Sequence, residues 1–569
     1  MTPLDWVVLA CWLTFLVSYG LWRGRGSATL NQYLLAGKSM PWYAMGLSIM
    51  ATQASAITFV ATTGQGFVDG LRFVQFYFGL PIAMVLISAT AVPVFHRTKV
   101  YTAYEYLEQR FDPKTRALVS VLFLIQRGLG AGIALYAPAV VLAVVLGWPD
   151  QNTTLLMGGL VILYTTSGGI KAVTWADVQQ MMVISASLLL AFGLAIYRLP
   201  ADIHFRDVLS LAGMAGRLNA VDTHMDWNNR YTLWSGLVGG TFLFLAYFGC
   251  DQSQVQRYLT GRSIAQSRLS LLFNAMAKIP LQLFILFIGV TVFVLFLFEP
   301  QPVLFQPVAL AQIQKDARFP AVRDRFDDAL ARRKAAANQF VTAAQSGDTV
   351  RRDQSKAAFR AAQTDIESSR KAAAGLVNAP GGFTDTNYIF LYYVMHSLPH
   401  GLIGLIVAVI FTAAMSAISG EINSLATVSV IDIYKRHINP GATDNHTLWA
   451  SRAATAFWGI YAVMFARYAG GLGSLIEAVN LVGSLFYGGM LGVFVLAFFF
   501  KSVGGRGAFA GVIAGELVTF AVARYTNVAF LWWNVVGCLV VVAVGVALGG
   551  ESRKAEAGVS IAAPSDRIR

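Results

Sequence analysis

The sequence predicts an all-α polytopic membrane protein with about thirteen transmembrane helices. Of its 569 residues, 56% are hydrophobic and only 13% are charged. Its mean hydropathy is +0.57, as expected for a chain whose core is a membrane bundle. Many apolar runs are long enough to cross a bilayer core of about 30 Å. In addition, Lys and Arg gather in alternate loops, as they do in the short cytoplasmic loops of membrane proteins.

The first apolar run, residues 1–22, lacks the basic start and the small-residue cleavage site of a signal peptide. We therefore expect it to be a retained first span. The further predicted spans are 45–67, 74–95, 117–147, 154–167, 178–199, 233–249, 269–298, 402–431, 450–465, 475–500, 507–523 and 529–548.

The net charge of +13 would suggest a nucleic-acid partner in a soluble protein. With the N-terminus outside, however, the positive charges fall in the predicted cytoplasmic loops and tail, and the short outside loop 148–152 has none. The charge is thus largely an orientation signal, and nucleic acid is excluded as a partner. The basic residues concerned are Arg97, Lys99, Arg110, Lys114, Arg116, Lys171, Arg257, Arg262, Arg268, Lys435, Arg436, Lys501, Arg506, Arg553 and Lys554.

One charged segment, 300–385, interrupts the membrane pattern, and we place it outside because long loops are translocated largely regardless of charge. Apolar residues fall on one helical face in each of its halves, and Ser346, Gly347 and Asp348 supply a stop and a new N-cap between them. The segment is predicted to be a two-helix hairpin, with a possible external partner. Its apolar faces comprise Phe326, Leu330, Ala337, Phe340 and Ala344, and Phe359, Ala362, Ile366 and Ala373.

Two apolar stretches carry small or polar residues in their middle. In 45–66, MGLSIMATQASAITFVATTGQG, these favour a broken helix around a solute and a cation, because freed carbonyls at membrane depth must be buried in protein or line a watery cavity. Close helix packing is the alternative. A second such stretch, 234–258, has midplane glycines. The second stretch begins five spans after the first. Because five is an odd number, the two five-span units would be inverted relative to each other in the membrane, as in many transporters.

A third stretch, 411–434, is FTAAMSAISGEINSLATVSVIDIY. Ser416 and Ser419 lie near mid-span with Ala413 one turn earlier, so hydroxyls and a carbonyl could converge on a small hard cation such as Na⁺. Alternatively, the hydroxyls bond to their own preceding turn.

With these motifs, the chain resembles the sodium:solute symporter family of sodium-coupled sugar, sialate, proline, iodide and vitamin carriers. The resemblance covers nearly everything except the external hairpin. It implies the LeuT-type five-plus-five inverted-repeat fold with flanking helices. The motifs that carry it are MPWYAMGLSIMATQASAITF, RFVQFYFGLP, YTAYEYLEQRFD, QRGLGAGIALYAP, TSGGIKAVTWADVQQ, YFGCDQSQVQRYL and AAMSAISGEINSLATVSVIDIY.

The predicted organisation is therefore as follows: 1–40, first span and cytoplasmic linker; 41–200, inverted repeat 1; 201–231, external loop; 232–500, inverted repeat 2, interrupted by the hairpin 300–385; 501–550, last two spans; 551–569, short cytoplasmic tail.

By resemblance, the main Na⁺ site uses the carbonyls of Ala51, Ala54 and Ala413 and the hydroxyl of Ser416. Family members usually have Ser or Thr directly after the position of Ser416, whereas this chain has Ala417. One oxygen is therefore missing.

Asp177 resembles the carboxylate that some members place beside a second Na⁺, together with a serine matching Ser419. Its alternative role is to pair with Lys171 at the cytoplasmic edge. We expect Na⁺ coupling, with a proton-using or Na⁺-independent site as the alternative.

Charged residues within spans are costly and so are functional candidates. Arg127 could receive an anionic group of the solute, or it could pair with an internal acid such as Glu421. Asp251 and Arg257 are predicted to form an inner gate with Gln252, and Glu421 to take part in coupling. Ser253 replaces a Tyr that sugar-carrying relatives tend to have, which weakens a sugar assignment.

The predicted function is Na⁺-coupled symport of a small polar or anionic solute, such as a monocarboxylate, a sugar or a related compound, by alternating access. Solute contacts are expected near the midplane, where the repeats meet. A non-transporting sensor or a membrane enzyme is the rival class. We expect the plasma membrane, the inner membrane of a bacterium, as the location. Besides Arg127, the predicted solute contacts are Gln53, Thr58, Gln75, Tyr77, Phe244 and Tyr247.

Overall fold

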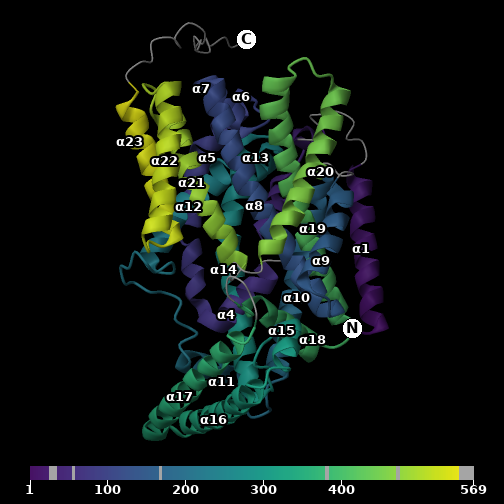
Figure 1. Ribbon diagram of the computed structural model, residues 1–569, viewed down its shortest axis with the longest axis vertical. Coiled ribbons are helices and arrows are strands. Elements are labelled where there is room, and N and C mark those ends of the chain that lie inside the picture. The colour runs from purple at the N-terminus through teal and green to yellow at the C-terminus, as the bar shows by residue number, and fades with distance from the viewer. Residues whose placement is uncertain are drawn as a thin grey trace, which may run out of the picture.

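The computed structural model describes residues 1–24, 32, 35–53, 58–165, 170–377, 383–469 and 475–549. Long helices form one bundle that runs between two ends (Figure 1). We call one the α7 end, where α6 and α7 lie, and the other the hairpin end, where α16 and α17 project from the bundle. The predicted tail 551–569 lies outside the described residues.

Every regular element of the described residues is a helix. In chain order these are α1 (Pro3–Gly24), η1 (Ala36–Lys38), α3 (Trp42–Gln53), η2 (Thr58–Thr62), α4 (Thr63–Asp69), η3 (Gly70–Tyr77), α5 (Leu80–Ala89), α6 (Ala91–Thr98), α7 (Ala103–Arg110), α8 (Pro113–Leu146), α9 (Asp150–Thr165), α10 (Ile170–Tyr197), α11 (Phe205–Met214), η4 (Ser235–Gly239), α12 (Gly240–Gly249), α13 (Gln252–Leu259), α14 (Ile264–Phe298), α15 (Pro307–Ile313), α16 (Phe319–Ser346), α17 (Thr349–Ala374), η5 (Thr386–Tyr388), α18 (Ile389–Ser397), α19 (Leu402–Val428), η6 (Ser429–Ile438), α20 (Asp444–Ala469), α21 (Leu475–Phe499), α22 (Gly505–Tyr525) and α23 (Phe530–Ala547).

Eight helical segments of the described chain are long and apolar enough to cross a membrane by length and composition alone. The other predicted spans lie in helices that are shorter, interrupted or more polar, such as α9 and α20. The predicted all-α membrane fold is confirmed. The eight segments are Val60–Thr98, Pro113–Leu146, Val173–Tyr197, Ile264–Phe298, Leu402–Ile438, Leu475–Phe499, Gly505–Tyr525 and Phe530–Ala547.

The first predicted broken helix consists of α3 and, after residues 54–57, the π-helical turn η2 and α4. Ala54 falls in the gap and lies outside the described residues. Both halves pack against α14. Glycines allow this contact at α4: a Cβ on Gly289 of α14 would meet the Thr63 carbonyl oxygen at 2.0 Å, and one on Gly66 would meet the Leu286 carbonyl oxygen at 2.3 Å.

The second predicted broken helix is interrupted at a different place from the one expected. The chain stays helical through Gly236, Gly239 and Gly240, and the interruption falls at Cys250 and Asp251, between α12 and α13. The glycines instead permit close packing, since a Cβ on Gly236 would meet the Gln75 carbonyl oxygen at 1.9 Å. The interruption therefore lies within the predicted stretch 234–258, beyond its midplane glycines.

The predicted hairpin is present as α16 and α17, and its connection is the predicted one. Gly347 ends α16 with a φ of 75°, and the Asp348 side chain accepts a hydrogen bond from the Arg351 amide at 3.0 Å as the N-cap of α17. The predicted apolar faces are mostly buried, including Phe326 and Phe359, whereas Ala344 is exposed.

Because α14 and α4 meet backbone to backbone, Gly289→Ala should destabilise the bundle by about 1–3 kcal/mol through overpacking. Thermal unfolding of the purified protein in detergent measures this as a lower midpoint. Gly193→Ala is the matched control, because a Cβ on Gly193 meets nothing within 4 Å. Equal midpoints for the two variants would contradict the close contact.

Candidate functional site

A cavity of about 760 Å³, counting the part open to solvent, lies between the two predicted broken helices. Polar side chains occupy part of its wall, and the rest is aromatic and aliphatic. A site of this kind suits a small organic molecule with one polar group. The lining residues are Thr52, Gln53, Phe76, Tyr77, Arg127, Gly130, Ala134, Leu243, Phe244, Tyr247, Ala417, Glu421, Ile476, Val479, Asn480 and Tyr487.

Arg127 of α8 is buried at this cavity and pairs with two carboxylates. Its guanidinium donates to Asp251, at the start of α13, and to Glu421 of α19 at 3.1 Å. It also donates to the Tyr487 hydroxyl at 3.2 Å and lies 5.4 Å from the centre of the Tyr247 ring. Of the two predicted roles, the internal pair with Glu421 is present. The charge of Arg127 is already neutralised, so it is a poor anchor for a solute anion.

Four of the other predicted solute residues line the cavity: Gln53, Tyr77, Phe244 and Tyr247. Thr58 and Gln75 do not. The Thr58 hydroxyl donates to the Gln53 carbonyl oxygen at 2.7 Å. The Gln75 side chain is directed elsewhere: it donates to the Tyr231 carbonyl oxygen at 3.0 Å and accepts from the Asp222 amide at 2.8 Å. Gln75 thus holds the loop before η4.

Two polar residues of the cavity wall, Asn480 and Tyr487 of α21, were not predicted. Their signal is visible in the sequence, because they lie seven residues apart in an otherwise apolar span and so share one helical face.

Lys278 of α14 was not predicted either, although it is a cation in a 35-residue apolar helix that otherwise carries only Arg268 nearer its start. It is 1% exposed, and its ammonium group forms no hydrogen bond with the described residues. Asn274 and Gln282, one turn to either side, are fully buried and also retain unpartnered amide atoms. This polar stripe lies behind the cavity wall, since Lys278 Nζ is 5.5 Å from the centre of the Tyr77 ring and Asn274 accepts from Gln53 at 3.0 Å.

Of the predicted Na⁺ residues, Ala51 lies on α3, and Ala413, Ser416 and Ser419 lie on α19, which is in contact with α3. Ala51, Ala413 and Ser419 are buried there. Ser416 lies in α19, but its side chain is outside the described part of the chain, as is all of Ala54. Ala417, which replaces a usual hydroxyl, presents its methyl group to the cavity.

Asp177 of α10 is buried and pairs with Arg257 of α13 at 2.8 Å. The Ser48 hydroxyl of α3 donates to the same carboxylate at 2.6 Å. The predicted gate residue Arg257 therefore joins α13 to both α3 and α10.

Comparison with known proteins identifies the chain. The profile of the sodium:solute symporter family matches residues 33–317 and 376–515, most of the sequence. The chain belongs to the sodium:solute symporter family. It is accordingly a multi-pass, Na⁺-coupled solute transporter rather than an enzyme.

Several relatives of this symporter carry a function in their names. This chain is 28% identical over 526 residues to the sodium-coupled monocarboxylate transporter 2 of Bos taurus, and the match covers 91% of this chain and 72% of that protein. It is 27% identical over 522 residues to the sodium-dependent multivitamin transporter of Oryctolagus cuniculus, with 91% and 69% covered. A solved Na⁺-coupled sialic acid symporter, 23% identical, shares its fold with a TM-score of 0.73 over 96% of this chain and 98% of that one.

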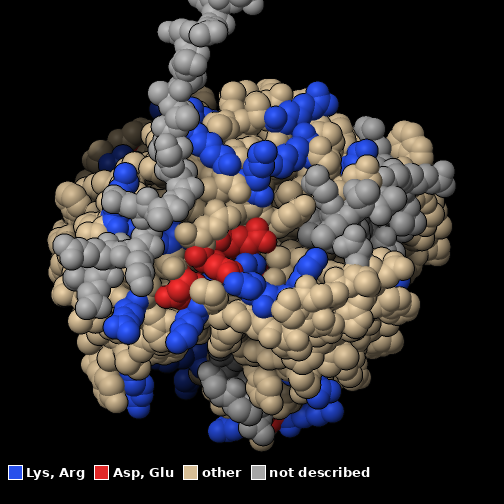
Figure 2. Space-filling view, turned by 90° about the horizontal axis from the view of Figure 1, so that it is seen from above, with Lys and Arg blue, Asp and Glu red and all other residues tan. Residues whose placement is uncertain are grey.

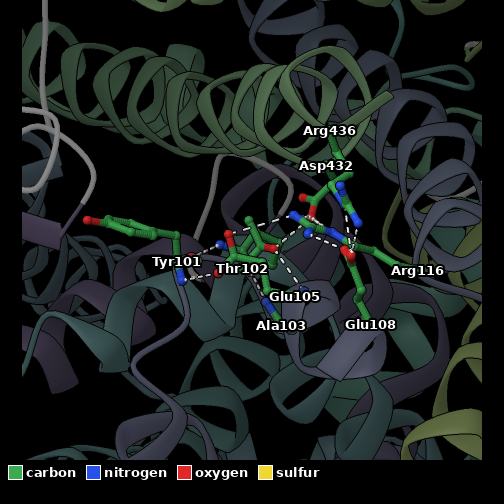
Figure 3. Close-up of polar contacts among 9 residues, drawn as sticks. Tyr101, Thr102, Ala103, Glu105, Glu108, Arg116, Asp432 and Arg436 are labelled. Atoms are coloured by element: carbon green, nitrogen blue, oxygen red, sulfur yellow. Dashed lines mark hydrogen bonds and ion pairs between the residues drawn. The ribbon is translucent and has the colours of Figure 1, made fainter. Parts of the chain in front are cut away.

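The α7 end of the symporter contains a second network of charges (Figure 3). Arg116 of α8 donates to Asp432 of η6 at 2.7 Å and to Glu108 of α7 at 2.7 Å. Arg436 of η6 donates to the other oxygen of Glu108 at 2.7 Å. Burial alone would raise the pKa of Glu108, but the hydrogen bonds from Arg436 and Arg116 lower it below its ordinary value.

Gln252 joins this network to the cavity. It follows Asp251, the partner of Arg127, and its amide accepts from the Ala103 amide and donates to the Tyr101 carbonyl oxygen, both at 2.9 Å. The Thr102 hydroxyl, between Tyr101 and Ala103 in the chain, donates to Asp432 at 2.9 Å. A nearly continuous polar path thus connects the cavity to the α7 end, and the predicted gate residues Asp251 and Arg257 lie at the two ends of α13.

Asp432→Asn removes the buried charge that Arg116 faces, so the free energy of opening at the α7 end should fall by on the order of 3 kcal/mol. Hydrogen exchange of amides in α7 and η6 measures the change. Arg436→Gln, which breaks a more exposed pair in the same network, is the control and should cost about 0–1 kcal/mol. Equal exchange in the two variants would show that Asp432 does not hold this end closed.

Proposed function

We propose that this symporter uses the Na⁺ gradient to take up a small monocarboxylate. The observation that carries the proposal is Lys278, a buried cation with no hydrogen-bond partner directly behind the cavity wall. A buried charge is normally paired, because an unpaired one costs several kcal/mol. The carboxylate of a solute would supply the missing partner.

Lys278 suits this role better than Arg127 because of their different surroundings. Arg127 already has Asp251 and Glu421. The ring of Tyr77 lies 5.5 Å from the Lys278 ammonium, a contact worth about 2 kcal/mol when desolvated. A turn of the Tyr77 side chain would open the way from the cavity to Lys278, and Asn274 and Gln282 would then donate to the same anion from either side.

The rest of the wall suits a short carbon chain. Phe76, Leu243, Phe244, Ile476 and Val479 give it an apolar surface. Charges also balance in number: Arg127 pairs with Asp251 and Glu421, and Lys278 adds a second positive charge, so a monocarboxylate and one Na⁺ would enter together without adding net charge. The names of the monocarboxylate and multivitamin relatives are in accord with this class of solute.

The Na⁺ is proposed to bind where the sequence predicted, between α3 and α19. Ala51 lies in the last described turn of α3, and its carbonyl oxygen and that of Ala413 on α19 are proposed to be among the Na⁺ ligands, since hard cations take oxygen ligands. Bound Na⁺ would fix Gln53 and Thr52 at the cavity wall. By linkage, an ion that raises solute affinity must have its own affinity raised equally.

We place the α7 end in the cytoplasm and the hairpin end outside. Figure 2 shows the α7 end, where Lys and Arg surround an acidic patch near the middle of the face. This is the end at which short loops carry the positive charge expected inside the cell. The two predicted repeats would rock against each other, and the plasma membrane is the proposed location.

Lys278→Met should abolish Na⁺-driven uptake of a labelled short monocarboxylate, such as propionate, into proteoliposomes, with at least about a hundredfold loss of apparent affinity. Lys278→Arg, which keeps the charge, is the control for packing and should retain part of the uptake. If Lys278→Met transported propionate like the parent protein, Lys278 would not be the anchor.

Ser416→Ala should remove Na⁺ stimulation while solute binding without Na⁺ persists, because one cation ligand is lost. Equilibrium binding of labelled solute, with and without Na⁺, measures this. Ser424→Ala is the control, since the Ser424 hydroxyl donates to the Gly420 carbonyl of its own helix at 2.9 Å. Unchanged Na⁺ dependence in Ser416→Ala would remove Ser416 from the Na⁺ site.

A further inference from the structure

The hairpin lies outside the family match, whose segments stop at residue 317 and resume at 376. It nevertheless packs on the transport bundle. Helix α16 contacts α11 and α14, and Ala336, Ala337, Phe340 and Val341 belong to the main apolar core. The half of α16 nearer the turn at Gly347 is therefore packed into this core, and α16 contacts the helix that carries Lys278.

Three arginines gather where the hairpin meets the bundle: Arg217 after α11, Arg333 of α16 and Arg370 of α17. Arg217 and Arg333 lie over the same ring, Phe293 of α14, at 4.9 and 5.8 Å from its centre. Arg370 lies 4.4 Å from the centre of the Phe305 ring. The Phe305 ring in turn lies 5.8 Å from that of Phe67, and Phe67 lies 5.5 Å from Phe293, so one aromatic cluster joins the three guanidinium groups.

The recorded hydrogen-bond acceptors of these arginines are all neutral. Arg333, which is 3% exposed, donates to the Gln363 side chain at 2.9 Å and to the Phe296 carbonyl oxygen at 3.0 Å. Arg370 donates to the Pro302 carbonyl oxygen at 3.1 Å. The Nε atoms of Arg333 and Arg217 are buried and have no hydrogen-bond partner in the part of the chain that the structure describes.

Arg370 and Arg217 both repel Arg333, whereas the main charges acting on Arg217 and Arg370 are those of Asp69 and Asp385. Burial, together with Arg370 and Arg217, lowers the pKa of Arg333 to about 9, and burial lowers the pKa of Arg217. The acids that act on the cluster, Asp69, Glu367 and Asp385, form no ion pair with it among the described residues.

We infer that Arg217, Arg333 and Arg370 form a binding site for a small monovalent anion, which ties the hairpin to the bundle. The free Nε–H groups would donate to the anion, as guanidinium does to halides and carboxylates. The anion is an inorganic halide from the medium or the carboxylate of an organic solute, because both offer the same charge and acceptor chemistry. The inference does not depend on the proposed solute, since the cluster is separate from Lys278.

The test is hydrogen exchange of the full-length protein in nanodiscs, followed in α16 and α17. Chloride replaces gluconate at constant Na⁺ concentration and ionic strength. At chloride about ten times above its Kd, exchange should slow about tenfold, because a ligand bound only to the docked hairpin reduces opening by the factor 1 + [L]/Kd. Acetate is titrated in the same way in Lys278→Met, where the proposed solute anchor is absent.

Saturable protection by chloride, or by acetate in Lys278→Met, supports the site and identifies the source of the anion. Arg333→Gln should lose the protection, and Arg217→Gln should weaken it, whereas Arg323→Gln, with an exposed side chain on α16, should keep it. If chloride does not protect the parent hairpin and acetate does not protect that of Lys278→Met, or if protection persists undiminished in both Arg333→Gln and Arg217→Gln, the site does not exist. Because no step measures transport, failure of propionate uptake would leave this result unaffected.

Discussion

The structure depends on the ion pairs of Arg127 with Asp251 and Glu421. The three charges are buried and come from α8, the start of α13 and α19, and Tyr487 of α21 donates to the same Asp251 carboxylate at 3.1 Å. Removing one partner of such a group costs about 3–5 kcal/mol, so these four elements stay together while any of the charges remains buried. These four elements form the side of the cavity that faces the α7 end. The same ion pairs therefore fix both the wall against which a solute would lie and the closed path between the cavity and the α7 end.

Helix α13 transmits that constraint. It is held at its start by Arg127 through Asp251 and near its end by Asp177 through Arg257. Between these anchors, Gln252 bonds the backbone of the turn before α7. Movement of α13 toward the solute or away from it would therefore pull on both α3, which holds Ser48, and α7. A two-state element biased by events at both ends is what coupling between an ion site and a gate requires.

The overall architecture follows from sequence periodicity, and so does the cap of the hairpin at Gly347 and Asp348, because both depend on local chemistry. Other features depend on neighbours distant in the chain. Nothing local shows that Gly236 touches the backbone at Gln75, or that the Gln75 side chain turns toward the 222–231 loop. Arg127 was recognisable as a functional charge, but which acids it meets depends on how α8, α13 and α19 pack. The sequence shows Lys278 as a cation in an apolar helix with amide side chains four residues away on either side. That this group lies behind Tyr77 at the cavity wall is visible only in the structure.

Lys278 and the arginine cluster present the same electrostatic problem at two depths of α14. In each, a cation lies beside an aromatic ring, Tyr77 in one case and Phe293 in the other, with no carboxylate in an ion pair among the described residues. A ring face offers part of the stabilisation that water would give, but not all of it. If one anion binds at Lys278 and another at the arginine cluster, α14 takes part in two contacts that depend on an anion. One is with the transported solute, and the other holds the hairpin. Because α14 packs tightly on α4 through Gly289 and Gly66, the hairpin would then brace the helix against which the first broken helix moves.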